Sequence, residues 1–258
     1  MPRTFDSTDD EIQTAIGAGD VAEPMTYVAI IRRTTDTDAQ RAFLGRTNSG
    51  LSGRGRLQIF STGNRLNYAN TVGNGDSTFT VVSSENWVLV AGSKAAGTAK
   101  PRLHKYVYDT DAWTHADSGD PAFGDGSTPG SSGLFRLGLT SSMDIQIAGF
   151  WARVLSDAEV EQLALTLQGW LAAAPTAAWL FDQSLTTQKL VDWTGGGANE
   201  SSIVGTSVPT ASAPIFSYGH PLLYPNQVAD AAPAGQPTMR RWGGVPHLGG
   251  APPQGRSW

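Results

Sequence analysis

The chain has 258 residues, of which 40% are hydrophobic and only 16% are charged, enough for one large β domain or two small ones. A formal net charge of −5 argues against non-specific nucleic-acid binding, because such binding needs a basic face that displaces counterions. The absence of cysteine excludes disulfides and thiolate zinc sites.

The first segment, MPRTFDSTDDEIQ, lacks the apolar core of a signal peptide. The rest of the chain has no run of about 18 apolar residues that could span a membrane. We therefore expect a soluble protein made without a secretion signal.

Glycine (30 residues) and proline (15 residues) predict many turns and short strands, and so an all-β body. The segment from Met25 to Arg32 predicts a buried strand, since β-branched and aromatic residues fit a packed sheet. Two further strands are joined by Thr62-Gly63-Asn64 as a hairpin. Residues 109–132 predict a long surface loop or insertion. The other predicted strands, each bounded by turn-forming residues, are 42–46, 56–61, 65–71, 79–84, 87–92, 102–108 and 134–139.

The stretch from Met143 to Pro175 changes its period partway along. It begins as a strand whose two predicted faces are Ile145, Ile147, Gly149 and Trp151, and Gln146, Ala148, Phe150 and Ala152. Ser156 and Glu159 then form a capping box, which predicts the start of one helix. Val160, Leu163, Leu167, Trp170 and Leu171 recur at helical spacing, and Pro175 ends the run. Seven to ten short strands with this spacing favour an antiparallel sandwich or jelly roll, with a closed barrel as the alternative.

Several motifs, taken in order, resemble a known family. They are FDSTDDEI from Phe5, MTYVAIIRR, WVLVAG from Trp87, RLHKYVYD, FRLGLT from Phe135 and IAGFWARVLSDAEVEQL. Together they resemble the landmarks of laminin-G-like, concanavalin A-like lectin/glucanase domains over roughly residues 3–171. The resemblance implies an all-β antiparallel β-sandwich, a jelly roll, with one helix after the last conventional strand and, in this chain, an extended C-terminal tail.

The family usually begins with strands for which this chain has no room before Phe5. Similar motifs occur after the predicted helix instead, as WLFDQ from Trp179, DWTGGGAN from Asp192 and SIVG from Ser202. We therefore interpret residues 1–213 as one circularly permuted domain in which residues 177–208 supply the first strands. The alternatives are a second, truncated domain or donation of this segment to a neighbouring subunit.

Residues 214–258 differ in composition from the rest and hold eight of the 15 prolines. This tail has neither strand nor helix periodicity and could not bury enough surface alone to offset its ordering entropy. We expect it to dock on another protein chain. Its candidate docking residues are the apolar anchors and arginines Arg240, Arg241, Trp242, Leu248, Arg256 and Trp258.

The resemblance raises the question of catalysis, because concanavalin A-like glycosidases use two carboxylates that flank the bond. This chain has no E-x-D-x-E pattern and carries Gln146 where relatives often have an acid. We expect no enzyme and no cofactor. Calcium is a candidate at Asp6, Asp9 and Asp10, although aspartate is also an ordinary turn-former. The four histidines show no metal-binding spacing, so the sequence predicts no zinc site.

Aromatic side chains at Tyr106, Tyr108 and Trp113 lie in or beside the predicted long loop and could stack on sugar rings. Trp87, Trp151, Trp170 and Trp179 fall at positions expected to face the core.

The resemblance, the missing signal peptide and the tail together suggest a non-enzymatic virion structural protein of a tailed phage, either a minor tail protein or a capsid decoration. Residues 214–258 would bind other virion proteins, and the sandwich could touch host-surface glycans, as a homo-oligomer for which we expect a trimer. The alternatives are a stand-alone carbohydrate-binding protein and a degenerate glycosidase.

Overall fold

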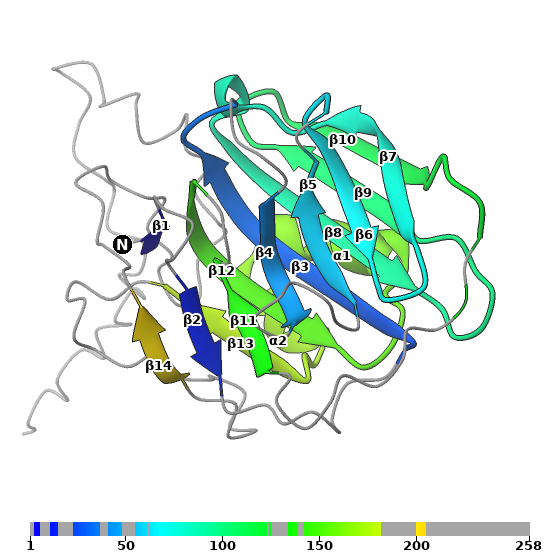
Figure 1. Ribbon diagram of the computed structural model, residues 1–258. Coiled ribbons are helices and arrows are strands. Elements are labelled where there is room, and N and C mark those ends of the chain that lie inside the picture. Colours follow the sequence, from blue (N-terminus) through cyan, green and yellow to red (C-terminus); the bar gives the residue numbers. More distant parts are fainter. Residues whose placement is uncertain are drawn as a thin grey trace, which may run out of the picture.

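The computed structural model describes residues 3–5, 11–14, 23–36, 41–47, 55–60, 62–122, 124, 134–138, 142–181 and 200–204. Two antiparallel sheets pack face to face, and the two short α-helices of this part of the chain come late in it (Figure 1). The predicted all-β antiparallel sandwich is confirmed.

The first sheet, sheet A, has the order β1-β12-β3-β8-β9-β10, with β13 also paired to β12. Its strands are β1 (Arg3–Phe5), β3 (Met25–Arg33), β8 (Trp87–Lys94), β9 (Arg102–Val107), β10 (Ala112–Asp117), β12 (Met143–Trp151) and β13 (Ala177–Leu180). The second, sheet B, has the order β14-β2-β11-β4-β5-β6-β7. Its strands are β2 (Glu11–Thr14), β4 (Arg41–Thr47), β5 (Arg56–Ile59), β6 (Arg65–Ala69), β7 (Asn74–Thr80), β11 (Leu134–Leu137) and β14 (Glu200–Val204).

Strand β3 shows why the middle of sheet A reads as a continuous apolar run. Tyr27, Ala29 and Ile31 pack between the two sheets, where side chains such as Leu57 and Tyr68 of sheet B meet them. Val28 and Ile30 belong to a second apolar cluster on the opposite face. Because both faces of the strand are buried there, its central residues Tyr27–Ile31 form a continuous apolar run.

Two helices cover that opposite face of sheet A, α1 (Asp157–Leu165) and α2 (Leu167–Ala172) (Figure 1). The capping box is confirmed: the Ser156 hydroxyl accepts from the Glu159 backbone N–H, and the Glu159 carboxylate accepts from the Ser156 N–H. Val160, Leu163 and Trp170 are buried against the sheet. Among the described residues, neither helix is long and apolar enough to cross a membrane.

The predicted single helix is wrong in one respect, because the chain is extended at Thr166 and the helix divides there. The Thr166 hydroxyl accepts from the Gly169 N–H and so begins α2. The two helices approach closely at this point: a Cβ atom on Gly169 would lie 2.3 Å from the carbonyl oxygen of Gln162. Only glycine fits this contact.

The predicted faces of β12 need a correction as well. A bulge falls between Ile145 and Ile147 where β12 pairs with β3. The extra residue shifts the alternation, so Ile145 packs between the sheets while Ile147 and Trp151 pack beneath the helices. The predicted grouping of Ile145 with Ile147 is therefore wrong, whereas Ala148 and Phe150 do lie together between the sheets.

Two other segments differ from the prediction. The strand expected at 79–84 begins earlier, at Asn74, because Asn70 accepts from the N–H groups of Val72 and Gly73 and closes a tight turn. The expected loop 109–132 contains β10, because Asp111 has a φ of 52° and turns the chain straight back along β9. The short 3-10 helix η1 (Ser83–Glu85) follows β7.

The strands after the helices join the sheets of their own chain. Strand β13 pairs with β12 and places Trp179 opposite Ala148, and β14 pairs with β2. Trp179 is fully buried between the sheets. The segment 177–208 thus contributes at least two strands to the sandwich, as the permuted arrangement requires, and the permutation relative to the family stays a prediction. The tail 214–258 lies outside the described residues.

One end of the sandwich holds a buried ion pair between Glu23 and Lys94. Lys94 Nζ lies 3.0 Å from Glu23 Oε2 and also donates to the carbonyl oxygens of Ala95 and Gly97. The other oxygen of Glu23 accepts from the Tyr68 hydroxyl and from the Asn70 amide. The Lys94 and Glu23 side chains are 0% and 3% exposed, so water reaches neither charge.

Candidate functional site

The hairpin formed by β9 and β10 gathers chemistry-bearing side chains on one face of sheet A. Its register places His104 opposite His115, Tyr106 opposite Trp113, and Arg102 opposite Asp117. Because side chains two residues apart in a strand share a face, all six project to the side that the helices cover. The start of α1 lies over this hairpin.

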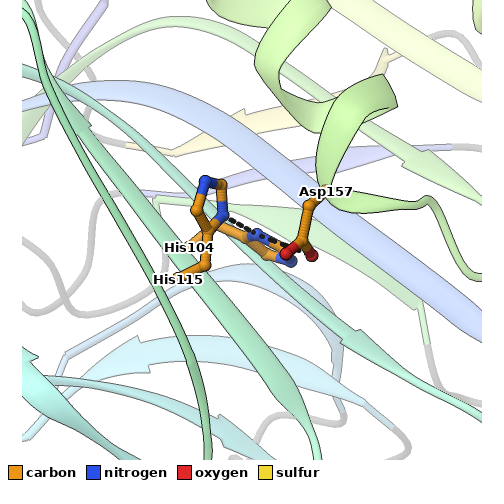
Figure 2. Close-up of side chains that lie close together, drawn as sticks. All are labelled: His104, His115 and Asp157. Carbon is orange, nitrogen blue, oxygen red and sulfur yellow. Dashed lines mark hydrogen bonds and ion pairs between the residues drawn. The ribbon is translucent and has the colours of Figure 1, made fainter.

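The two imidazoles meet the carboxylate of Asp157, the first residue of α1 (Figure 2). His104 Nδ1 lies 2.8 Å from His115 Nδ1 and 3.8 Å from Asp157 Oδ1. One potential ligand atom from each of the three residues lies within 4.8 Å of the others. The histidine rings meet edge to face at 78°.

A second set of contacts holds these three side chains in place. Glu161, one helical turn after Asp157, has Oε1 3.1 Å from His115 Nε2. Arg102 donates to both oxygens of Asp157, from Nη2 to Oδ2 at 2.5 Å and from Nε to Oδ1 at 3.2 Å. Arg102 also binds Asp117 on β10 at 3.2 Å. Residues four apart share a helix face, so the capping box that begins α1 also aims both carboxylates at the hairpin.

Burial decides the charge of the site. His104 is fully buried, and burial lowers its pKa to about 4, so its imidazole is neutral near pH 7. The hydrogen bonds from Arg102 hold the pKa of Asp157 below its usual value, so this carboxyl is ionised. A neutral imidazole has one nitrogen that donates and one that accepts, yet His104 Nε2 finds no partner among the described residues.

Aromatic rings form the wall beside this cluster. Trp113 stacks on His115 with ring centroids 5.1 Å apart and packs against Tyr106 at 4.7 Å with the two rings tilted by 34°. Tyr106 and Tyr108 are buried, and their hydroxyls donate to Asp111 and to the backbone of Ala164. The two tyrosines predicted to contact glycans are therefore core residues that hold the hairpin and α1 together. Of the three, Trp113 alone is half-buried.

The other predicted site residues belong to two segments, the N-terminal aspartates and the C-terminal tail. Asp6, Asp9 and Asp10, the calcium candidates, lie outside the described residues, as do the docking residues Arg240, Arg241, Trp242, Leu248, Arg256 and Trp258. Within the described part of the predicted loop, Asp111 and Asp117 bind side chains of β9, and Asp120 accepts from the Asp76 N–H.

The pairing of His104 with His115 was not predicted, because the two residues do not have the spacing of a helical metal site or of a known metal-binding motif. The signal that could have found it is the turn Asp109-Thr110-Asp111 after a predicted strand. A tight turn at these residues pairs Val107 with Ala112. Three residues further from the turn on each strand, the same register pairs His104 with His115. Two imidazole nitrogens and a carboxylate oxygen form a donor set that suits zinc.

No protein-family model matches the chain, and no curated protein matches it. Among solved structures, the full extracellular region of zebrafish Gpr126/Adgrg6 is 11% identical with a TM-score of 0.44, over 81% of this chain and 25% of that one. The binding domain of botulinum neurotoxin DC in complex with rat synaptotagmin II is 15% identical with a TM-score of 0.32, over 54% of this chain and 34% of that one. The chain thus spans between a quarter and about a third of these structures. Similarities at this level assign neither a family nor a function.

Proposed function

We propose that this chain is a non-enzymatic β-sandwich module of a tailed-phage virion, which binds neighbouring virion proteins through residues 214–258 and presents its sandwich to a partner. The observation that carries the non-enzymatic part is the way the sandwich uses its carboxylates. Among the residues that the structure describes, the buried acids Asp144, Glu23 and Glu11 each bind a cation of the same chain.

Glycosidase chemistry on this type of fold needs two carboxylates that face a common substrate, one of them free to give a proton. Asp144, the single acid of β12, is 1% exposed and binds Arg32 and the Thr4 hydroxyl. The neighbouring position that could supply a partner acid is Gln146, which is also buried. This strand therefore offers no pair of accessible acids.

The same holds for the other two deeply buried acids among the described residues. Glu11 on β2 binds Arg136 at 2.6 Å, and Glu23 binds Lys94. A buried carboxylate that already binds a cation of its own chain is not available to a substrate. Structural use of the acids supports a binding or scaffolding role for the sandwich.

The tail supports the assembly part of the proposal. Its composition gives it no core of its own, and Trp242, Leu248 and Trp258 supply apolar anchors that a partner surface would bury. Immunogold electron microscopy on purified tailed-phage particles, with an antibody raised against the full chain, tests the virion role. Regular labelling at one place on the particle is the expected result, and particles without label would refute it.

Trp113 keeps the lectin alternative open, since a half-buried indole at the edge of the hairpin can stack on a sugar. A glycan array with the full chain and with Trp113→Ala distinguishes the hypothesis of a virion module from that of a stand-alone lectin. Binding that is strong in the wild type, lost in the variant, and unaffected by removal of residues 214–258 would favour a stand-alone lectin. A hydrolysis screen on polysaccharides tests the glycosidase reading, and we expect no turnover.

A further inference from the structure

We propose that His104, His115 and Asp157 bind one divalent transition-metal ion, with Zn²⁺ as the best fit, and that the ion fastens α1 to the β9–β10 hairpin. This site is independent of the glycan and virion roles. It involves residues from three separate elements, none of which carries a metal motif in the sequence.

The distances bracket what a tetrahedral zinc site requires. Zinc–nitrogen bonds of about 2.0–2.1 Å place tetrahedral ligand atoms about 3.3 Å apart. The Nδ1–Nδ1 distance is 2.8 Å and the distance from His104 Nδ1 to Asp157 Oδ1 is 3.8 Å. Seating the ion would open the first pair and close the second by about half an ångström each, and would also draw together His115 and Asp157, whose ligand atoms lie within 4.8 Å. Side-chain torsions alone can supply such changes.

The surroundings resemble those that orient ligands in metal sites. A ligating histidine usually donates its second ring N–H to a carboxylate. Glu161 Oε1 lies 3.1 Å from His115 Nε2 and can accept this hydrogen bond. This contact leaves His115 Nδ1 with a lone pair that accepts from His104 Nδ1–H. Binding of the ion therefore requires the His104 proton to move from Nδ1 to Nε2. Arg102 donates to Oδ2 of Asp157 at 2.5 Å. This hydrogen bond fixes the orientation of the carboxylate, whose Oδ1 lies 3.8 Å from His104 Nδ1.

The cluster is partly open to solvent, which gives an ion a way in. His104 is fully buried, whereas the His115 and Asp157 side chains are 17% and 42% exposed. Three protein ligands leave one position for water, as in other zinc sites with three ligands. The guanidinium of Arg102 repels a cation to some degree, so we expect micromolar rather than nanomolar affinity.

The test is isothermal titration calorimetry with ZnCl₂ on the full chain, free of any affinity tag and dialysed against EDTA. We expect one Zn²⁺ per chain. Asp157→Asn removes a ligand atom. Glu161→Gln removes the hydrogen-bond partner of His115, and we expect this variant to bind Zn²⁺ 10- to 100-fold more weakly than the wild type. Asp120→Asn is the matched control, because it also removes one carboxylate near the end of β10, but Asp120 accepts from the Asp76 N–H and lies outside the ligand cluster. It should bind Zn²⁺ like the wild type.

A second readout is the visible absorption of the Co²⁺-loaded protein, which should report a tetrahedral site in the wild type and in Asp120→Asn and should vanish in Asp157→Asn. His115→Gln is a further ligand variant, and far-UV circular dichroism checks that each protein is folded. If His115→Gln fails to fold, the two helix variants still decide the question. Absence of saturable Zn²⁺ binding, or equal affinity in the wild type and Asp157→Asn, would overturn the proposal.

Discussion

Replacing Lys94 by methionine should be among the most damaging single changes that keep the shape of the core. Lys94 and Glu23 lie 3.0 Å apart with side chains 0% and 3% exposed. At this separation their attraction is about 5 kcal/mol for an effective dielectric constant of about 20. Methionine fills the space but leaves the Glu23 carboxylate with only the hydrogen bonds from Tyr68 and Asn70. Breaking a buried pair in this way costs about 3–5 kcal/mol of the free energy of unfolding.

Urea unfolding, followed by tryptophan fluorescence and far-UV circular dichroism, measures this loss. In thermal unfolding, we expect Lys94→Met to lower the melting temperature by roughly 10 °C, since a domain of this size loses about 2–4 °C per kcal/mol. The double variant Glu23→Gln/Lys94→Met removes both charges and should recover a large part of the loss, because no charge stays buried alone. The cycle should show a coupling energy of about 2–3 kcal/mol.

An exposed pair serves as the control for these variants. Asp117 is 66% exposed and binds Arg102 at 3.2 Å, so Asp117→Asn should change stability by less than about 1 kcal/mol. A cost of less than about 1 kcal/mol for Lys94→Met would show that the substitution does not leave a buried, uncompensated charge at Glu23. Simple addition of the effects of the two substitutions in the double variant would show that the two charges are not coupled.

Three further predictions concern the helices and the histidine cluster. Leu163→Asp puts an unpaired charge in the fully buried contact of α1 with sheet A and should cost about 3 kcal/mol or more in urea unfolding; a smaller cost would mean that α1 is not firmly packed. Gly169→Ala should cost about 1–3 kcal/mol because its Cβ would meet the Gln162 carbonyl at 2.3 Å, whereas Gln168→Ala on the exposed side of α2 should stay within about 0.5 kcal/mol; equal effects would refute the close contact. In EDTA, which keeps the cluster free of metal, burial lowers the pKa of His104 from its usual 6.5 to about 4, beside Asp157, His115, Arg102 and Asp117. The unfolded chain therefore binds more protons than the folded chain between pH 6.5 and pH 4. Stability should thus fall by up to about 3 kcal/mol as pH drops from 6.5 to 4, a loss that His104→Gln should reduce, and an unchanged pH profile in that variant would count against the assignment.

The sequence predicts the sandwich because its signals are local. The apolar run of β3, the hairpin at Gly63-Asn64 and the capping box at Ser156 each act within a few residues, and the structure contains all three. The four tryptophans predicted to face the core are buried. Periodicity and turn chemistry are sufficient where neighbouring residues alone decide the conformation.

The missed features depend on partners far along the chain. The bulge in β12 lies next to Gln146, whose carbonyl oxygen accepts from the Phe181 N–H, a residue 35 positions later. The break at Thr166 exists because α2 packs back on Gln162. The histidine cluster combines a hairpin register with the position of a helix that follows 42 residues after His115. Pattern analysis of single segments has no access to such long-range pairings.

The same edge of β12 is shared by strands from the two ends of the described chain. Strand β1 pairs with residues 143–145 and β13 with residues 147–150. During synthesis, β12 leaves the ribosome with half of this edge unpaired, and it stays open until residues 177–180 follow. An open edge strand is a template for aggregation, and pairings of such long sequence separation form slowly. Nascent chains that stall between Trp151 and Ala177 should therefore be the species most prone to misassembly, and the last strands complete the protection of the fold.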